Sequence, residues 1–134
     1  MRSDINDGFV WVARKNFKPR SIIKIKNKDN GKVVYCEYLE VDQNFLNDYN
    51  KKPRLTINPN EDLIVISEWY RKKLGDIPTK QEVDLDINEV DSHWAKFRTC
   101  INHPQIVVRL SSWLAVISVC LGIVSFILGV ISVV

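Results

Sequence analysis

Basic residues gather in one stretch of the chain, where their spacing suits the binding of phosphate. Between positions 14 and 32 there are eight basic residues and one acidic residue. The predicted ligand contacts are Arg14, Lys15, Lys18, Arg20, Lys24, Lys26 and Lys28. The last three alternate along a predicted strand, so their ammonium groups lie on one face and could bind a nucleotide, a short nucleic acid or lipid headgroups. A solvated strand face that discourages edge-to-edge pairing explains the same pattern.

Aromatic residues in the same part of the chain could stack on nucleic-acid bases. They are Trp11, Phe17, Tyr35 and Tyr38. The simpler expectation is that these four side chains belong to the hydrophobic core, because large aromatic rings contribute much of the apolar surface that a small domain buries.

Residues with the spacing needed for catalysis are few. The chain has two histidines, His93 and His103, and neither has metal-ligand spacing to a cysteine or a carboxylate. Cys36 and His93 could be imagined as a nucleophile and its base, but no local signature accompanies them. Glycine-rich phosphate loops and hydrolase motifs are also missing from the sequence. We therefore expect no enzymatic activity, no catalytic residue, no metal site and no cofactor.

An acidic run follows later in the chain, with five acids and no base between positions 82 and 91. Four of its five carboxylates could bind a divalent cation: Asp84, Asp86, Glu89 and Asp91. They do not fit the spacing of a calcium-binding loop. An acidic face near the start of a helix is the more ordinary explanation.

The last 25 residues, 110–134, carry no charge, whereas all 19 Lys/Arg and all 16 Asp/Glu lie within residues 1–109. A helix of this length spans roughly 37 Å, and a bilayer has a hydrocarbon core of about 30 Å. The sequence therefore predicts a transmembrane helix over 104–134, beginning at a proline, with Arg109 at the water boundary. A buried core helix is the alternative, but the rest of the chain is too small to surround it.

Charge and cysteine content predict the orientation of this helix. The chain begins with polar residues rather than a signal peptide, and no basic residue follows Arg109. We expect a single-pass protein of the cell inner membrane with its N-terminal domain in the cytoplasm. Three widely spaced cysteines, Cys36, Cys100 and Cys120, are expected to be reduced.

Small residues form a stripe along the predicted membrane helix. They are Ser111, Ala115, Ser118, Gly122, Ser125, Gly129 and Ser132, and the steps between them alternate between four and three. Between Trp113 and Val134, Cys120 is the one small residue off this stripe. Small residues allow helices to pack closely in lipid, and a mean spacing of 3.5 predicts a left-handed bundle of parallel helices.

With one span in each chain, the partners in such a bundle must be other chains, and a homo-oligomer is the simplest solution. A dimer or trimer would bury the stripe in a tight seam. Four or more copies, which we favour, would turn the serine hydroxyls toward a narrow lumen. Chance spacing of residues that are common in membrane helices is the remaining alternative.

Local patterns predict an α+β fold in three parts. Residues 1–88 form a small β-barrel-like domain, 89–103 a linker helix and 104–134 the transmembrane helix. Predicted strands cover 8–14, 20–28, 32–40, 63–66 (as a short strand or turn) and 81–87, and predicted helices cover 42–50, 68–74 and 88–100. Turn residues at 29–31 connect two of the strands as a hairpin, and a second turn is predicted at 58–60.

One segment resembles a recurring half of double-psi β-barrel domains. Residues 66–75 are Ile-Ser-Glu-Trp-Tyr-Arg-Lys-Lys-Leu-Gly, and Thr79 and the alternating residues 83–87 follow. In that family a short helix ending in Leu-Gly leads through a turn into a barrel strand. The resemblance could cover residues 8–88, and the chain departs from it at Asp76-Ile77-Pro78, where a tighter glycine-containing turn is usual.

The overall layout resembles the compact membrane effectors of bacterial anti-phage systems, of which the Hailong-type channel is one. That resemblance implies a homo-oligomeric channel or membrane-permeabilising effector that is gated through its cytosolic domain. It also implies a nucleotide or short nucleic acid as the ligand and a partner enzyme that makes it. The alternatives are a tail-anchored adaptor that recruits a protein partner to the membrane and a lytic protein without a ligand.

Overall fold

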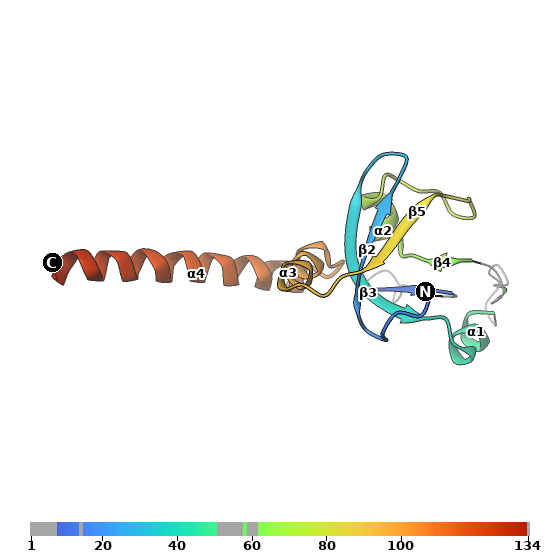
Figure 1. Cartoon of the computed structure of the whole chain (residues 1–134), viewed down its shortest axis with the longest axis horizontal. Coiled ribbons are helices and arrows are strands. Elements are labelled where there is room, and N and C mark those ends of the chain that lie inside the picture. Colours follow the sequence, from blue (N-terminus) through green and yellow to red (C-terminus); the bar gives the residue numbers. More distant parts are fainter. Residues whose placement is uncertain (1–7, 14, 51–57, 59–61, 134) are drawn as a thin grey trace.

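The computed structural model of the chain describes residues 8–13, 15–50, 58 and 62–133 (Figure 1). The elements in chain order are β1 (Phe9–Val12), β2 (Ile22–Asn27), β3 (Val33–Glu40), α1 (Gln43–Tyr49), β4 (Ile64–Val65), α2 (Glu68–Lys73), β5 (Leu85–Glu89), α3 (His93–Asn102) and α4 (Ile106–Val133). Figure 1 shows a twisted sheet with α3 between it and α4, and α4 extends away from the sheet.

The five described strands form one sheet in the order β4-β1-β3-β2-β5. β1 and β3 pair in parallel, and the other neighbours pair antiparallel. The predicted α+β class is therefore confirmed. β4 and β5 lie at the two edges, and no pairing between them closes the sheet within the described residues.

Alternation along the strands places the core on one face of the sheet, as the period of two requires. Three strands, α2 and the C-cap of α2 contribute its buried residues: Val10, Val12, Ile23, Ile25, Val34, Cys36, Tyr38, Tyr70 and Leu74. The opposite face of β2 and β3 packs against α3, where Ala95 is buried and Arg98 lies over the Tyr35 ring.

The β2–β3 hairpin turn is tied to the end of α2 by two amides. Asn27, a buried polar residue, donates from Nδ2 to the Leu74 carbonyl at 3.0 Å, and Asn30 donates to the same oxygen at 2.8 Å. The next residue, Gly75, has φ +110, and a Cβ there would overlap the Asn30 amide. Glycine is therefore required where the helix stops, for both backbone and steric reasons.

β5 and α3 begin later than the sequence predicts. The partner strand sets the limits of β5, because the antiparallel register places Leu85 opposite Asn27 and Glu89 opposite Ile23. Val90 N–H then donates to the Ile22 carbonyl at 2.8 Å, which holds this residue in extended backbone. The predicted start of the linker helix at 88–89 is therefore wrong. The helix begins at His93, where the Ser92 hydroxyl accepts from Trp94 N–H at 3.3 Å and caps it.

The apolar C-terminal helix is confirmed, with a start at Ile106 rather than at Pro104. Its 28 residues span about 42 Å, longer than a bilayer core. None of these residues is buried in the single chain, and large apolar side chains surround the helix. Among the described residues it is the one helix long and apolar enough to cross a membrane, which is compatible with single-pass anchoring.

Candidate functional site

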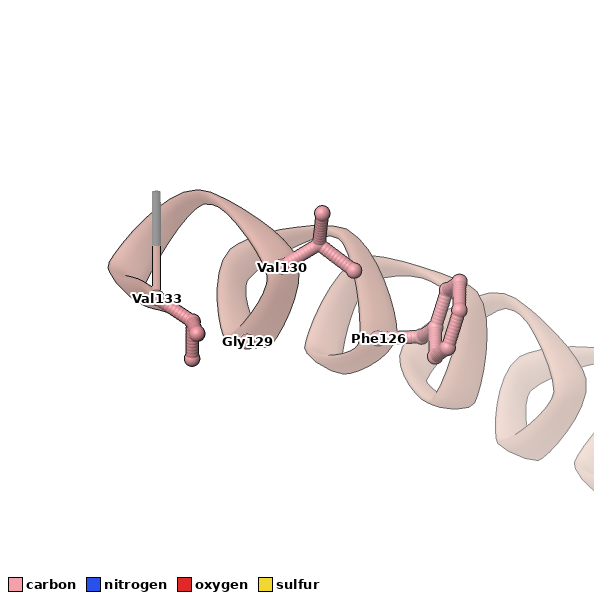
Figure 2. Close-up of a pocket in the computed structure, with 4 residues that line it drawn as sticks. All are labelled: Phe126, Gly129, Val130 and Val133. Atoms are coloured by element: carbon pink, nitrogen blue, oxygen red, sulfur yellow. The ribbon is translucent and has the colours of Figure 1, made fainter.

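The stripe of small residues lies along α4, and all seven of its members are exposed in the single chain. Ser111 lies at the polar end, and its hydroxyl donates a hydrogen bond to the Val107 carbonyl of the same helix at 2.8 Å. Figure 2 shows the other end, where Phe126, Val130 and Val133 surround Gly129. Because glycine has no side chain, the helix surface is hollowed there.

The two glycines of the stripe face open space. A Cβ placed on Gly122 or on Gly129 would meet nothing within 4 Å. Neither position requires glycine for the fold of one chain, and glycine is a poor helix former in water. A partner helix that packs closely against the stripe would explain why both positions are glycine.

The structure separates the basic residues that were predicted to bind a ligand. Arg14 lies outside the described residues. Lys15, Lys18 and Arg20 are exposed in the connection between β1 and β2. Arg20 lies 3.5 Å from a Glu37 carboxylate oxygen and its guanidinium is over the Phe9 ring.

The lysines of β2 and its turn meet the acidic run on the neighbouring strand. Lys26 lies opposite Asp86 in the β2–β5 register, and Lys28 forms an ion pair with Asp84 at 2.7 Å. The hydrogen bond and charge of Asp84 raise the pKa of Lys28. Lys24 is half-buried. The basic and acidic stretches are far apart in sequence. In the sheet they lie side by side, on β2 and on the neighbouring edge strand β5.

The acidic run is distributed along this edge rather than gathered at a helix start. Asp86 and Glu89 lie on β5, and Asp91 pairs with Lys96 of α3 at 3.1 Å. Within the described residues, no group of three or more His, Cys, Asp or Glu side chains is arranged to hold a metal ion.

Cys36 lies in the core, and burial raises the pKa of its thiol far above the usual range. That environment disfavours the thiolate, which is the nucleophilic form.

Of the aromatic residues considered for base stacking, Tyr38 belongs to the core and Phe17 packs against it, whereas Trp11 and Tyr35 are half-buried on the opposite face of the sheet. Tyr38 is buried, donates its hydroxyl to the Lys15 carbonyl at 2.6 Å and contacts Phe17 edge to face. Trp11 is half-buried and stacks on Phe45 of α1 with ring centroids 5.0 Å apart. These contacts account for Tyr38, Phe17 and Trp11 as side chains that pack within the domain.

A junction between the sheet domain and α4 was not identified from the sequence. Trp69 of α2 donates from Nε1 to the Asn102 carbonyl at 2.8 Å, and Lys73 donates to the Asn102 side chain at 3.0 Å. From α4, Arg109 lies over the Trp69 ring at 4.5 Å from its centroid. Two helices of the domain and the first turn of α4 thus meet at one indole.

The bend between α3 and α4 is held by the same arginine. Arg109 donates to the carbonyls of His103 and Pro104 at 2.8 and 3.0 Å. The ring of His103 lies so close to Gly8, next to β1, that a Cβ on Gly8 would overlap it. The sequence signals the bend through Pro104, and the bonds of Arg109 are local. Trp69 and Asn102, however, are 33 positions apart, and no local pattern reports their contact.

Comparison of the chain with protein-family models, with curated proteins and with solved structures finds no match.

Proposed function

We propose that this protein is a homo-oligomeric membrane effector, a channel or permeabilising assembly, in which α4 spans the bilayer and the sheet domain stays on the cytoplasmic side. The observation that carries the proposal is the stripe of small residues along a helix of which no residue is buried against the described part of the chain. Helices in lipid associate through close packing and polar contacts, and this stripe offers both.

Control of the assembly through the sheet domain is the second part of the proposal. At the junction, Trp69 of α2 donates a hydrogen bond to Asn102 at the end of α3, and Arg109 in the first turn of α4 lies over the Trp69 ring. A rotation of the domain would therefore act on the start of the membrane helix. For a ligand to gate the assembly, it must bind one state of it more tightly than the other.

A phosphate-bearing ligand, such as a nucleotide or a short nucleic acid, is the proposed gating molecule. The exposed Lys15 and Lys18 of the β1–β2 connection and Lys26 of β2 are the cations that we expect to contact it. Lys28 is a weaker choice, because a ligand would compete there with the charge of Asp84.

Native mass spectrometry of the full chain in detergent tests the oligomer. We expect four or more copies for the unmodified protein, and a shift to monomers for Gly122→Leu and Gly129→Leu, because a leucine on the stripe would separate the packed helices. Cys120→Leu is the matched control, since it enlarges a small residue of the same helix that lies off the stripe.

A monomeric unmodified protein would contradict the proposal and favour the tail-anchored adaptor. Equal effects of the stripe variants and of Cys120→Leu would also contradict it, because association would then not depend on the stripe.

A further inference from the structure

We propose that Lys73 and Arg109 together bind the phosphate of an anionic lipid headgroup at the junction between α2 and α4. This inference rests on the membrane insertion of α4, and it adds a ligand and a site to the proposed function. The two cations belong to different parts of the chain, and both lie over the ring of Trp69, at 5.2 Å for Lys73 and 4.5 Å for Arg109.

No acid neutralises this pair within the described residues, where no carboxylate lies within 4 Å of either cation. Their other contacts are with neutral groups, namely the Asn102 side chain and two backbone carbonyls. Burial and the nearby charge of Arg109 lower the pKa of Lys73. An anion placed between the two cations would remove their mutual repulsion.

Both side chains keep donors available for such an anion. A guanidinium has five N–H donors, and the two carbonyls of the bend occupy those on one nitrogen of Arg109. Lys73 uses one of the three donors of an ammonium for the Asn102 side chain. Neither residue is fully buried. Phosphate accepts several charge-assisted hydrogen bonds at once, which suits this set of donors.

The position of the pair along α4 favours a lipid over a soluble anion. Arg109 is the last charged residue before the uncharged stretch, and Trp113 lies about 6 Å further along the helix. Tryptophan prefers the headgroup zone of a bilayer, and basic residues just outside a span attract anionic lipids. The cations therefore lie at the depth of the lipid phosphates when α4 spans the membrane.

A lipid held there would connect the two halves of the junction. Its phosphate would contact α2 through Lys73 and α4 through Arg109, and so fasten the sheet domain to the start of the membrane helix. Anionic lipid content would then influence the same contact through which we propose that the domain controls the assembly.

The test counts lipids bound to the full chain in detergent by native mass spectrometry, with phosphatidylglycerol and phosphatidylcholine of identical acyl chains as probes. We expect phosphatidylglycerol to bind at least about fivefold more tightly than phosphatidylcholine, and Lys73→Gln to weaken it about fivefold. Lys73→Arg should retain binding. The matched control is Lys72→Gln, which removes a neighbouring lysine that pairs with Glu68 at 2.9 Å, and it should bind like the unmodified protein.

Equal binding of the two lipids, or equal losses in Lys73→Gln and Lys72→Gln, would overturn the proposal. If Lys73→Gln fails to fold, Arg109→Gln tests the same site from the other helix and should show a similar loss. Displacement of the lipid by inorganic phosphate would identify a soluble anion as the ligand and overturn the lipid assignment. The same spectra report copy number, so monomers with a Lys73-dependent lipid would contradict the oligomer and retain this site.

Discussion

At the scale of single residues, Asn27 is the one polar residue that is buried among the described residues outside the aromatic and cysteine side chains of the core. It is buried, it donates to the Leu74 carbonyl, and its own side-chain oxygen accepts from Asp29 N–H at 2.9 Å. Without this amide, the Leu74 carbonyl would keep only the Asn30 donor, and the Asp29 N–H would lose its side-chain acceptor. The amide thus secures both the hairpin turn and the end of α2.

We expect Asn27→Ala to lower the free energy of unfolding by about 1–3 kcal/mol, because one buried and one partly buried hydrogen bond are lost. Denaturant unfolding of the protein in detergent, followed by tryptophan fluorescence, measures this change. Asn88→Ala is the control, since the Asn88 amide is exposed and bonds the neighbouring Asp86 side chain. The control should change stability by less than about 0.5 kcal/mol. Similar losses in the two variants would contradict the role of Asn27.

At the scale of elements, the pairing of β2 with β5 brings opposite charges together at the sheet edge. Lys28 and Asp84 form the closest ion pair there, and Lys26 lies opposite Asp86. Like charges at such positions destabilise an antiparallel pair. Replacing the three lysines Lys24, Lys26 and Lys28 by Glu would therefore disturb the sheet as well as any ligand site, so that change alone does not test ligand binding.

A charge exchange separates these two effects. We expect Lys28→Glu alone, and Asp84→Lys alone, to lower the melting temperature of the sheet domain by a few degrees, because each places like charges side by side. The double variant should recover most of the loss. The measurement is thermal unfolding by circular dichroism at low and high salt, and the single-variant losses should shrink as salt screens the charges. Losses that simply add in the double variant would show that the two side chains do not interact.

At the scale of the whole molecule, the question is what the stripe of small residues does in an assembly. A tight seam needs small side chains but no hydroxyls. A lumen formed by four or more helices would turn Ser118 and Ser125 toward water or ions, which interact with the hydroxyl oxygens. Replacing serine by alanine keeps the size of the residue small and removes the hydroxyl, so it distinguishes the two arrangements.

We expect the double variant Ser118→Ala, Ser125→Ala to keep its copy number in native mass spectra and to lose ion conductance in planar bilayers. Ser112→Ala is the control, because the Ser112 hydroxyl bonds the Val108 carbonyl of its own helix at 2.9 Å and lies off the stripe. Conductance that is unchanged in the double variant would favour a seam without a serine-lined lumen.

Much of the element order could be predicted from local patterns. The alternation in β2 and β3, the Asp29-Asn30-Gly31 turn, the stop of α2 at Gly75 and the uncharged stretch of α4 all express backbone geometry over a few residues. The predictions for 81–87 and for the start of the linker helix were displaced, because pairing with β2 decided where β5 begins and ends. The first and last residues of a strand depend on the strand with which it pairs, and the local alternation of residues carries no information about that partner.

The sequence by itself determined the separation of a charged domain from an apolar helix, and the phase of the small residues along that helix. Both follow from composition and from the 3.6-residue period. Only the tertiary structure decided that the basic and acidic runs face each other, and that Trp69, Lys73 and Arg109 meet at one junction. Those contacts join residues far apart in the chain, and they exist because one arrangement of the sheet and helices buries the core.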